Sequence, residues 1–464
     1  MTNAISSTYQ KRNPFNGDIV GEHPAADVAQ TIEAVDAATD AFPAWASLPL
    51  QQRAAFLTGA ARLLEVRVET IAADMTAEMG KPIREARGET LRAAQIVRYA
   101  ASSAFRATGQ EFEQAGGGSV SVLRRPLGVV GLITPWNFPI AIPAWKLAPA
   151  LMCGNTAVLK LAYDAPATGL HLARAFTDAG LPGGVLQVLT GRGSVIGEAL
   201  THEQRVRAIS FTGSVTTGSG VRDAVTTRGA RVQLELGGQN PLIIMADADL
   251  DRAAAAAFAG AFWSAGQKCT ATRRIYVHDE AYDAFRDKLL ARIKRGRIGD
   301  PLDPEVEVGP IVSESQYADI FAAIERGKQE GGAVIAGGQG ADDHGYLIAP
   351  TVFEGVRDDA FLSCEEVFGP VTSLYRFETL DEAMRRANGV PFGLSAGIFT
   401  SSLATATRFK NGAEAGLIHI NSQTAGADVH VPFGGIKGSG FGPHEQGRAA
   451  IEFYTDLVTI YVDA

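Results

Sequence analysis

The stretch Gly128–Pro139, GVVGLITPWNFP, decides the fold class. Its first part, Val129–Ile133, is a short apolar run that ends at a Thr-Pro pair. A short apolar run bounded by turn-forming residues is typical of a buried strand. The stretch therefore predicts a strand with Asn137 just beyond its carboxyl end, where the sheets of α/β proteins gather their ligands.

Further apolar runs follow this strand and alternate with helical patterns such as His171–Ala179. The first series comprises Val129–Ile133, Ala157–Leu159, Val185–Val188 and Ala208–Phe211. The second series comprises Pro241–Met245, Arg274–Val277, Val334–Ala336, Val371–Arg376, Ala396–Phe399 and Gly416–Ile420. Such alternation indicates βαβ units and parallel sheets. We therefore expect two α/β lobes with a cleft between them.

Two other patterns lie on the amino-terminal side of this stretch. Apolar residues at helical spacing across Val28–Ala73 predict a layer of amphipathic helices. The glycines of Gly116–Gly118 separate Glu111–Gln114 from the alternating Ser119–Leu123, which predicts a hairpin with exposed edges. A hairpin of this kind often serves assembly.

Composition excludes several classes of protein. The 464 residues are 46% hydrophobic, enough for two to four structural units with large cores. A net charge of -9, without a basic stripe, argues against nucleic acid and anionic membranes as partners. The three cysteines, at positions 153, 269 and 364, fit neither disulfides nor metal-ligand pairs. No signal peptide or spanning segment appears, so we expect a cytoplasmic protein without a metal site.

Cys269 follows an Ala-rich helical run and a Gly-Gln turn. A nucleophilic cysteine needs thiolate character, which a polar turn and neighbouring dipoles supply, whereas a structural cysteine needs only packing. For the residue alone, the structural interpretation is favoured about two to one.

Glu235 lies between two leucines at the end of the strand-like Val232–Leu236. Apolar neighbours raise the pKa of a carboxyl group and suit it to act as a general base. An exposed, ion-paired glutamate is the more common alternative for an isolated residue. Asn137 offers an uncharged amide donor for an oxyanion, although asparagine is equally common in turns.

Two glycine-rich stretches are candidates for binding a dinucleotide. Gly191–Gly197 is one residue longer than the standard G-x-G-x-x-G spacing. Phe211–Gly218 follows a strand and opens a helix, so its first amides suit a pyrophosphate, and a plain Ser-capped helix is an equal alternative. Lys160 and Glu366 suit ribose hydroxyls or are solvated surface charges. His430 suits a pocket wall or a structural role.

Seven motifs, taken together and in this order, resemble the aldehyde dehydrogenase superfamily over essentially the whole chain. They are Pro135–Pro139, Leu159–Lys160, Phe211–Ser214, Leu234–Gly238, Gly266–Cys269, Glu365–Pro370 and Pro432–Gly440. The LELGG and GQKC elements are specific, so a chance match of all seven is very improbable. With all seven motifs present, functional roles are favoured over structural ones for Cys269, Glu235 and Asn137.

The resemblance implies a mechanism. Cys269 attacks the aldehyde, and the Asn137 side chain with the Cys269 backbone amide holds the oxyanion. Hydride leaves for a nicotinamide, and Glu235 activates the water that hydrolyses the resulting thioester. Retention of Glu235 argues against acyl transfer to coenzyme A. A non-catalytic structural protein on the same scaffold is the alternative of a different class.

The resemblance also implies NAD or NADP as cofactor. Lys160 and Glu366 are expected at the two riboses, Ser214 at the pyrophosphate and Phe368 beside the nicotinamide. The other residues expected at the cofactor are Thr134, Pro135, Trp136, Tyr163 and Gly213. Many NAD-preferring members have a glutamate three residues after the lysine, whereas this chain has Tyr163, so NADP remains open.

The implied fold is α/β, with a Rossmann-like cofactor domain, an α/β catalytic domain and a small β oligomerisation element. The expected ranges are 1–106 and 126–237 for the cofactor domain, 238–440 for the catalytic domain, and 107–125 with 441–464 for the oligomerisation element. A homodimer or homotetramer is expected.

The substrate is expected to be a small-molecule aldehyde. The stretches Ala141–Lys146, Thr424–Gly435 and Gly442–Gly447 resemble the subgroup of 2-oxoglutarate semialdehyde (2,5-dioxopentanoate) dehydrogenases. Trp145 and His430 are the expected pocket residues. Succinate semialdehyde and aromatic aldehydes of the benzaldehyde or vanillin type are alternatives. A carboxylate-bearing substrate needs a cationic or multiple-donor site, and the sequence does not say which arginine reaches the pocket.

Overall fold

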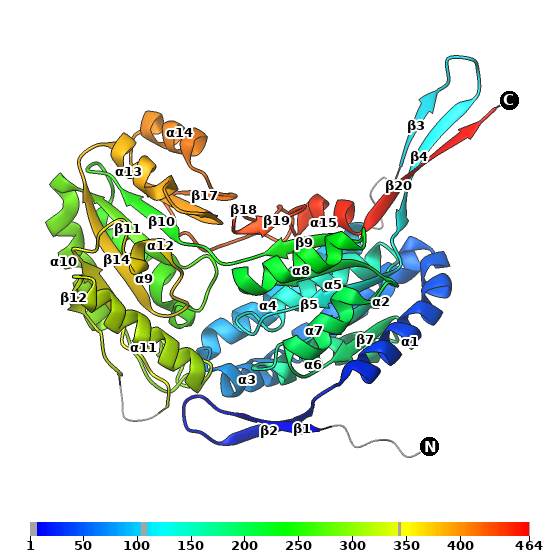
Figure 1. The fold of residues 1–464 in the computed structure, drawn as a ribbon, viewed down its shortest axis with the longest axis horizontal. Helices are drawn as coiled ribbons and strands as arrows, with labels where there is room; N and C mark the ends of the chain where they lie inside the picture. The colour runs from blue at the N-terminus through cyan, green and yellow to red at the C-terminus, as the bar shows by residue number, and fades with distance from the viewer. Residues whose placement is uncertain (1–6, 104–108, 342–344, 464) are drawn as a thin grey trace.

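The computed structural model describes residues 7–103, 109–341 and 345–463. Two α/β lobes lie side by side, and a three-stranded arm projects from one of them (Figure 1). The α/β architecture expected from the alternating runs is confirmed. Residues 1–6, 104–108, 342–344 and 464 of the predicted domain ranges lie outside the described residues.

The first lobe contains a six-stranded sheet in the order β19-β9-β8-β5-β6-β7. The strands are β5 Val129–Ile133, β6 Thr156–Lys160, β7 Leu186–Leu189, β8 Val206–Thr212, β9 Arg231–Glu235 and β19 Gly440–Phe441. All neighbours are parallel except β19, which runs antiparallel to β9. β5 and β6 are completely buried, which explains why they read as continuous apolar runs.

Helices cover this sheet and extend it into a helical layer, as expected for 28–73. They are α1 Val28–Ser47, α2 Leu50–Val66, α3 Val68–Met79, α4 Ile83–Ser102, α5 Ala141–Met152, α6 Pro166–Asp178, α7 Gly193–His202, α8 Val215–Thr227 and α15 Gly447–Phe453. Helix α5 packs against α4 and is buried along nearly its whole length. It begins directly after the TPWNFP stretch, so its packing fixes that loop.

The second lobe contains a seven-stranded sheet in the order β12-β13-β14-β11-β10-β16-β17. The strands are β10 Asn240–Ile244, β11 Thr272–His278, β12 Ala333–Ala336, β13 Thr351–Glu354, β14 Val371–Phe377, β16 Ser395–Phe399 and β17 Leu417–Ile420. Only β12 is antiparallel to its neighbour. The apolar-run pattern does not predict β13, because its four residues TVFE contain only two adjacent apolar side chains.

The remaining elements of the second lobe are helices, a 3₁₀ turn and two short paired strands. They are α9 Leu250–Phe262, the 3₁₀ turn Trp263–Gly266, α10 Asp279–Arg295, α11 Glu314–Gln329, α12 Phe361–Cys364, α13 Leu380–Asn388, α14 Leu403–Gly412, and the paired β15 Phe392–Gly393 and β18 Ile436–Lys437. A separate hairpin, β1 Thr8–Arg12 with β2 Ile19–Pro24, lies beside the first lobe near the amino terminus (Figure 1).

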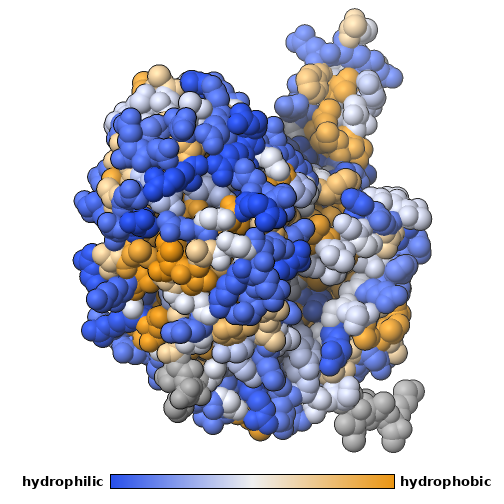
Figure 2. Space-filling model, turned by 60° about the vertical axis from the view of Figure 1, so that its left-hand side comes forward, coloured by the Kyte–Doolittle hydropathy of each residue, from blue (hydrophilic) through white to orange (hydrophobic). Residues whose placement is uncertain are grey.

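The arm consists of β3 Gly109–Glu113, β4 Ser119–Pro126 and β20 Thr455–Val462. The hairpin predicted around the triple glycine is present, and β20 pairs with β4 over eight residues. Figure 2 shows apolar side chains along the arm, where Phe112, Leu457 and Tyr461 are exposed. By contrast, β19 and α15 belong spatially to the first lobe. The functional division of the chain stays a prediction.

No helix among the described residues is long and apolar enough to cross a membrane.

Candidate active site

The carboxyl ends of four parallel strands meet at one edge of the first-lobe sheet. Ile133 at the end of β5 pairs with Lys160 of β6 and Phe211 of β8, and Thr212 pairs with Glu235 of β9. The chain goes from β5 to β6 and β7 on one side, then returns to β8 and β9 on the other. Ligands of open α/β sheets bind at such a switch point. The sheet order therefore gathers four of the predicted site segments at one edge.

Cys269 lies in the loop that follows α9. Ser264 and Ala265 adopt left-handed backbone conformations with φ of 55° and 53°, and Gly266 follows with φ of 67°. A side chain at Gly266 would collide with the backbone of Gly369, so glycine is required there. This turn ends helix α9, and the chain then continues to Cys269 at the junction of the two lobes.

Hydrogen bonds hold the loop on both sides of the cysteine. The Gln267 side chain accepts from the Val312 amide at 3.0 Å, and Arg273 donates to the Gly266 carbonyl at 2.6 Å. The Asn240 side chain donates to the Cys269 carbonyl at 2.8 Å. Because Asn240 closely follows the LELGG motif, this bond couples the cysteine loop to the glutamate loop.

The Cys269 thiol is in an environment that disfavours its thiolate. Burial, together with the nearby carboxyl groups of Glu366 and Glu235, raises the pKa of the thiol to about 12. These surroundings oppose the thiolate character that a polar turn and neighbouring dipoles can supply, so that expectation stays a prediction.

Asn137 faces the same loop. Its Nδ2 donates to the Gln267 carbonyl at 3.1 Å, two residues before the cysteine. Its backbone carbonyl accepts from Lys81 Nζ at 2.7 Å, and Lys81 forms a buried ion pair with Glu89. Glu89 also accepts from the Ile140 amide at 3.1 Å, at the start of α5. The asparagine is thus fixed from three directions, which suits a preorganised donor.

Glu235 ends β9 with its side chain buried. Its Oε2 has no hydrogen-bond partner among the described residues. Burial raises the pKa of Glu235 well above its ordinary value, and Glu445 adds to the rise, whereas Lys146 and the Gly435 amide oppose it. A carboxyl group with a raised pKa and one free oxygen is suited to exchange protons near neutral pH.

Two of these neighbours of Glu235, namely Lys146 and Glu445, were not predicted from the sequence motifs. Lys146 forms a buried ion pair with Glu445, and both bond to Ser210 in β8. The signal was a single lysine in the otherwise apolar helix segment Ala141–Met152, because a buried lysine requires a partner. Sequence alone could not identify that partner, which lies 299 positions away.

Glu366, Phe368 and Trp136 lie close together on the cleft side. The Gly238 amide donates to Glu366 Oε1 at 3.2 Å, and a side chain at Gly237 would collide with the same carboxyl group. Burial raises the pKa of Glu366 to about 7. The Phe368 ring meets the Trp136 ring edge to face at 5.5 Å. These residues, like Cys269, therefore border the junction of the two lobes.

Lys160 ends β6 and is 6% exposed. The Thr134 amide donates to the Lys160 carbonyl at 3.2 Å, which joins two predicted cofactor residues. The structure shows no hydrogen bond or ion pair from Lys160 Nζ to any described residue, and burial lowers its pKa to about 8. Burying an ammonium group without a partner costs free energy, unless a ligand supplies the missing hydrogen bonds.

Tyr163 lies near this lysine in the β6–α6 connection. Its ring stacks on Tyr9 at 4.1 Å, and the Arg192 guanidinium lies over it at 5.3 Å. Arg192 immediately precedes α7, and Lys160 Nζ would lie 3.6 Å from a Cβ placed at Gly193. Arg192 was not singled out from the sequence, because a surface arginine in a glycine-rich stretch carries no signal by itself.

Gly213 and Ser214 lie at the start of α8. The Gly213 amide donates to the Glu235 carbonyl at 3.1 Å, and Ser214 caps the helix by accepting from the Thr217 amide. A side chain at Gly213 would crowd the Phe211 ring at 2.5 Å. Both sequence-based interpretations of this stretch, a capped helix and open first-turn amides, agree with this geometry.

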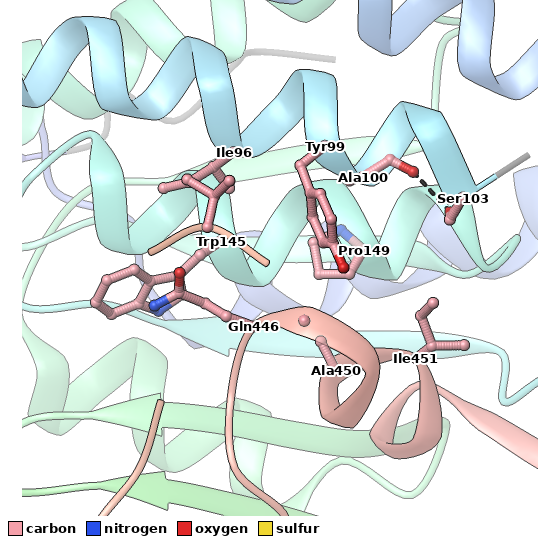
Figure 3. A pocket seen from close by; sticks show the side chains of 11 residues that line it. Ile96, Tyr99, Ala100, Ser103, Trp145, Pro149, Gln446, Ala450 and Ile451 are labelled. Carbon is pink, nitrogen blue, oxygen red and sulfur yellow. Dashed lines mark hydrogen bonds between the residues drawn. The ribbon is translucent and has the colours of Figure 1, made fainter. Parts of the chain in front are cut away.

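A cavity that opens to solvent lies between α4, α5 and α15. Figure 3 shows Ile96 and Tyr99 above Trp145 and Gln446. Trp145, a predicted pocket residue, therefore lines the cavity. His430 does not line it; this exposed residue lies with its ring 6.5 Å from that of Tyr99. Its assignment to the substrate stays a prediction.

Comparison with known sequences gives a consistent family. Residues 1–460 match the aldehyde dehydrogenase family. An alpha-ketoglutaric semialdehyde dehydrogenase of Bacillus subtilis (strain 168) is 44% identical over 97% of this chain and 93% of its own length. A 2,5-dioxopentanoate dehydrogenase of Saccharolobus solfataricus is 40% identical over 92% of this chain and 90% of its own length.

Solved structures agree with this fold. An NADP-dependent enzyme of E. coli superposes with a TM-score of 0.96 at 36% identity, over 99% of this chain and 95% of the other. PnpE, crystallised in complex with nicotinamide adenine dinucleotide, superposes with a TM-score of 0.96 at 35% identity, over 98% of this chain and 94% of the other.

Proposed function

This chain belongs to the aldehyde dehydrogenase family, and from that premise we propose that it oxidises a semialdehyde of the 2-oxoglutarate semialdehyde kind to the acid with NAD or NADP. The observation that carries the reaction is the meeting of Cys269, Glu235 and Asn137 in one buried site. The names of the 40–44% identical relatives support the substrate class.

In the proposed reaction, Cys269 Sγ forms a bond with the aldehyde carbon while its thiol proton passes to water. The second Nδ2 hydrogen of Asn137 and the Cys269 backbone amide stabilise the oxyanion. The nicotinamide, when bound, supplies the acceptor for the hydride of that carbon. The acyl group then remains on Sγ as a thioester.

Glu235 completes the proposed cycle. Its unpartnered Oε2 accepts a proton from water as the water oxygen attacks the thioester, and the carbon–sulfur bond breaks to release the acid. Lys146 opposes the charge of Glu445 beside it, so that Glu235 can ionise in spite of burial. Overall, an aldehyde, water and oxidised cofactor give a carboxylic acid, reduced cofactor and a proton.

The residues present fit a dinucleotide. Lys160 offers an ammonium without a partner, the start of α8 offers backbone amides, and Glu366 offers a buried carboxyl group for a ribose hydroxyl. Thr134, Pro135, Trp136 and Phe368 would line the remaining path. Tyr163 and Arg192 lie near Lys160 without a carboxylate at position 163, which is compatible with the 2′-phosphate of NADP as well as with NAD.

We also propose that the arm mediates a homodimer or homotetramer. Its exposed apolar residues and the unpaired edges of β3 and β20 would be covered by a second copy. Sedimentation of the full chain tests this, with the Leu457→Glu variant expected to shift the protein toward monomer.

The experiment that tests the reaction is an initial-rate assay of reduced nicotinamide. We expect turnover of 2-oxoglutarate semialdehyde with a higher kcat/KM than succinate semialdehyde, benzaldehyde or pentanal, and loss of turnover in Cys269→Ala. A preference for benzaldehyde would refute the substrate class. No turnover of any aldehyde would favour a non-catalytic role.

A further inference from the structure

Helix α4 connects the asparagine loop with the cavity. Toward its amino end, Glu89 accepts from the Ile140 amide directly beyond the TPWNFP stretch. Toward its carboxyl end, Ile96 and Tyr99 line the cavity. Arg92 lies three residues after Glu89 and four before Ile96, so all three share one face of the helix.

One nitrogen of the Arg92 guanidinium is buried without a hydrogen-bond partner among the described residues. Its Nη2 is inaccessible to solvent and forms no hydrogen bond within the described ranges. Glu89 is already bonded to Lys81 and to backbone amides, and Asp428 lies beyond ion-pair distance, since no pair within 4.0 Å forms. A buried guanidinium nitrogen left unbonded costs free energy, which an anionic ligand would recover.

Two further unsatisfied groups lie in the wall of the cavity. Trp145 Nε1 has no hydrogen-bond partner, and neither amide atom of Gln446 has one. Gln446 is 3% exposed and has a positive φ of 61°, an uncommon conformation for a residue other than glycine. Figure 3 shows the Trp145 indole and the Gln446 side chain beside each other. Buried donors without partners are rare in native proteins, so their grouping here points to a ligand.

The remaining walls of the cavity are largely apolar. Ile96 and Trp145 belong to one hydrophobic cluster, against which Ala427, Val429 and Cys269 also pack. The reactive thiol and the cavity therefore border the same apolar core.

Resting on the proposed function, we infer that Arg92, Gln446 and Trp145 form the subsite for the distal carboxylate of the substrate. Arg92 supplies the positive charge, and the Gln446 amide and Trp145 indole supply neutral donors. The occupant is a short aliphatic aldehyde whose far end carries a carboxylate. Asp428 at the exposed rim limits the net positive charge.

The test compares two aldehydes of equal chain length, 2-oxoglutarate semialdehyde and pentanal. In Arg92→Met, kcat/KM for the semialdehyde should fall roughly 10- to 100-fold, mainly through KM, because a charge-assisted hydrogen bond is lost. The value for pentanal should change less than about twofold. Gln446→Glu should lower the semialdehyde value by a similar factor by placing a negative charge against the carboxylate.

A matched control lies on the same helix. Arg98 is exposed and bonds Glu65, so Arg98→Met makes the same chemical change away from the cavity. It should leave both substrates unaffected. Equal losses for both aldehydes in Arg92→Met, or no loss for either, would overturn the inference.

Binding separates this inference from the proposed function. Glutarate titrated into the full chain by calorimetry should bind the parent protein and Arg98→Met, and should bind Arg92→Met at least tenfold more weakly. If no aldehyde is oxidised but glutarate binding still depends on Arg92, the proposed function fails and the anion subsite stands. If pentanal is oxidised while glutarate binds both variants equally, the reverse holds.

Discussion

Buried cations are paired with carboxylates in one region of the first lobe and are unpaired in another. Between the helices and the sheet, Lys81 is paired with Glu89, and Lys146 is paired with Glu445. At the carboxyl edge of the sheet and beside the cavity, Lys160 and the Nη2 of Arg92 have no partner among the described residues. Paired charges hold loops in place, whereas unpaired ones raise the free energy of the empty protein until a ligand binds.

The largest effect is expected from breaking a paired cation. Lys146→Met leaves Glu445 buried beside Glu235 without its counter-charge, so the free energy of unfolding should fall by about 3–5 kcal/mol. Urea denaturation followed by far-UV circular dichroism measures it. The Lys146→Met/Glu445→Gln double variant should regain part of the loss, and a parent-like stability of the single variant would contradict the comparison.

Removing an unpaired cation should act the other way. The pKa of Lys160, about 8 against 10.5 for the free side chain, means that its charge opposes folding below pH 8, and that this penalty fades as the pH rises from 8 to 10.5. Lys160→Met should therefore be at least as stable as the parent at pH 7. Its affinity for the dinucleotide should fall about 10- to 100-fold.

Thermal unfolding at pH 7 and 10 and cofactor titration by intrinsic fluorescence check both parts. The stability difference between Lys160→Met and the parent should shrink at pH 10. Lower stability at pH 7 with unchanged cofactor affinity would show that Lys160 is structural.

The Cys269 thiol resembles the unpaired cations in that its surroundings disfavour its charged form. Because only the thiolate reacts and the pKa of the thiol is about 12, its alkylation by iodoacetamide should rise about tenfold per pH unit between pH 7 and 10, without a plateau near 8.5. Peptide mass spectrometry distinguishes Cys269 from Cys153 and Cys364. A plateau below pH 8 would show that the free protein already stabilises the thiolate.

The smallest effect concerns Arg192, which lies over the Tyr163 ring near Lys160. If it contacts the 2′-phosphate, Arg192→Gln should weaken binding of NADP about fivefold and leave binding of NAD within about twofold. The dissociation constants for the two cofactors are the readout. An equal change for both would show that Arg192 does not distinguish them.

The fold was largely predictable because its strands are buried on both faces. Runs such as Val129–Ile133 and Ala157–Leu159 read as strands, and the structure confirms them as β5 and β6. β13 was missed because its TVFE segment contains only two apolar residues, and the β1–β2 hairpin because it lies at the surface. The hairpin of the arm was predicted from its own residues, whereas a third strand within 441–464 was expected only from the family resemblance; the structure pairs it, as β20, with β4.

The site was predictable only in part. The motifs located Cys269, Glu235 and Asn137 as candidates, since each stands in a specific short pattern. The structure places them together. It also places Glu366 and Glu235, which come from other loops, near Cys269, where they raise the pKa of the thiol. No motif indicated Arg92 or Gln446, because their distinguishing property is the absence of a partner in three dimensions.

The sequence by itself determined the alternation of strands and helices, the family and the reactive groups, because these follow from local periodicity and from short motifs. Tertiary structure alone decided which charges are paired and which are left open. Lys146 finds Glu445 across 299 positions, whereas Arg92 finds no partner on its own helix. Desolvation and pairing depend on distances in space, and those distances exist only once the chain has folded.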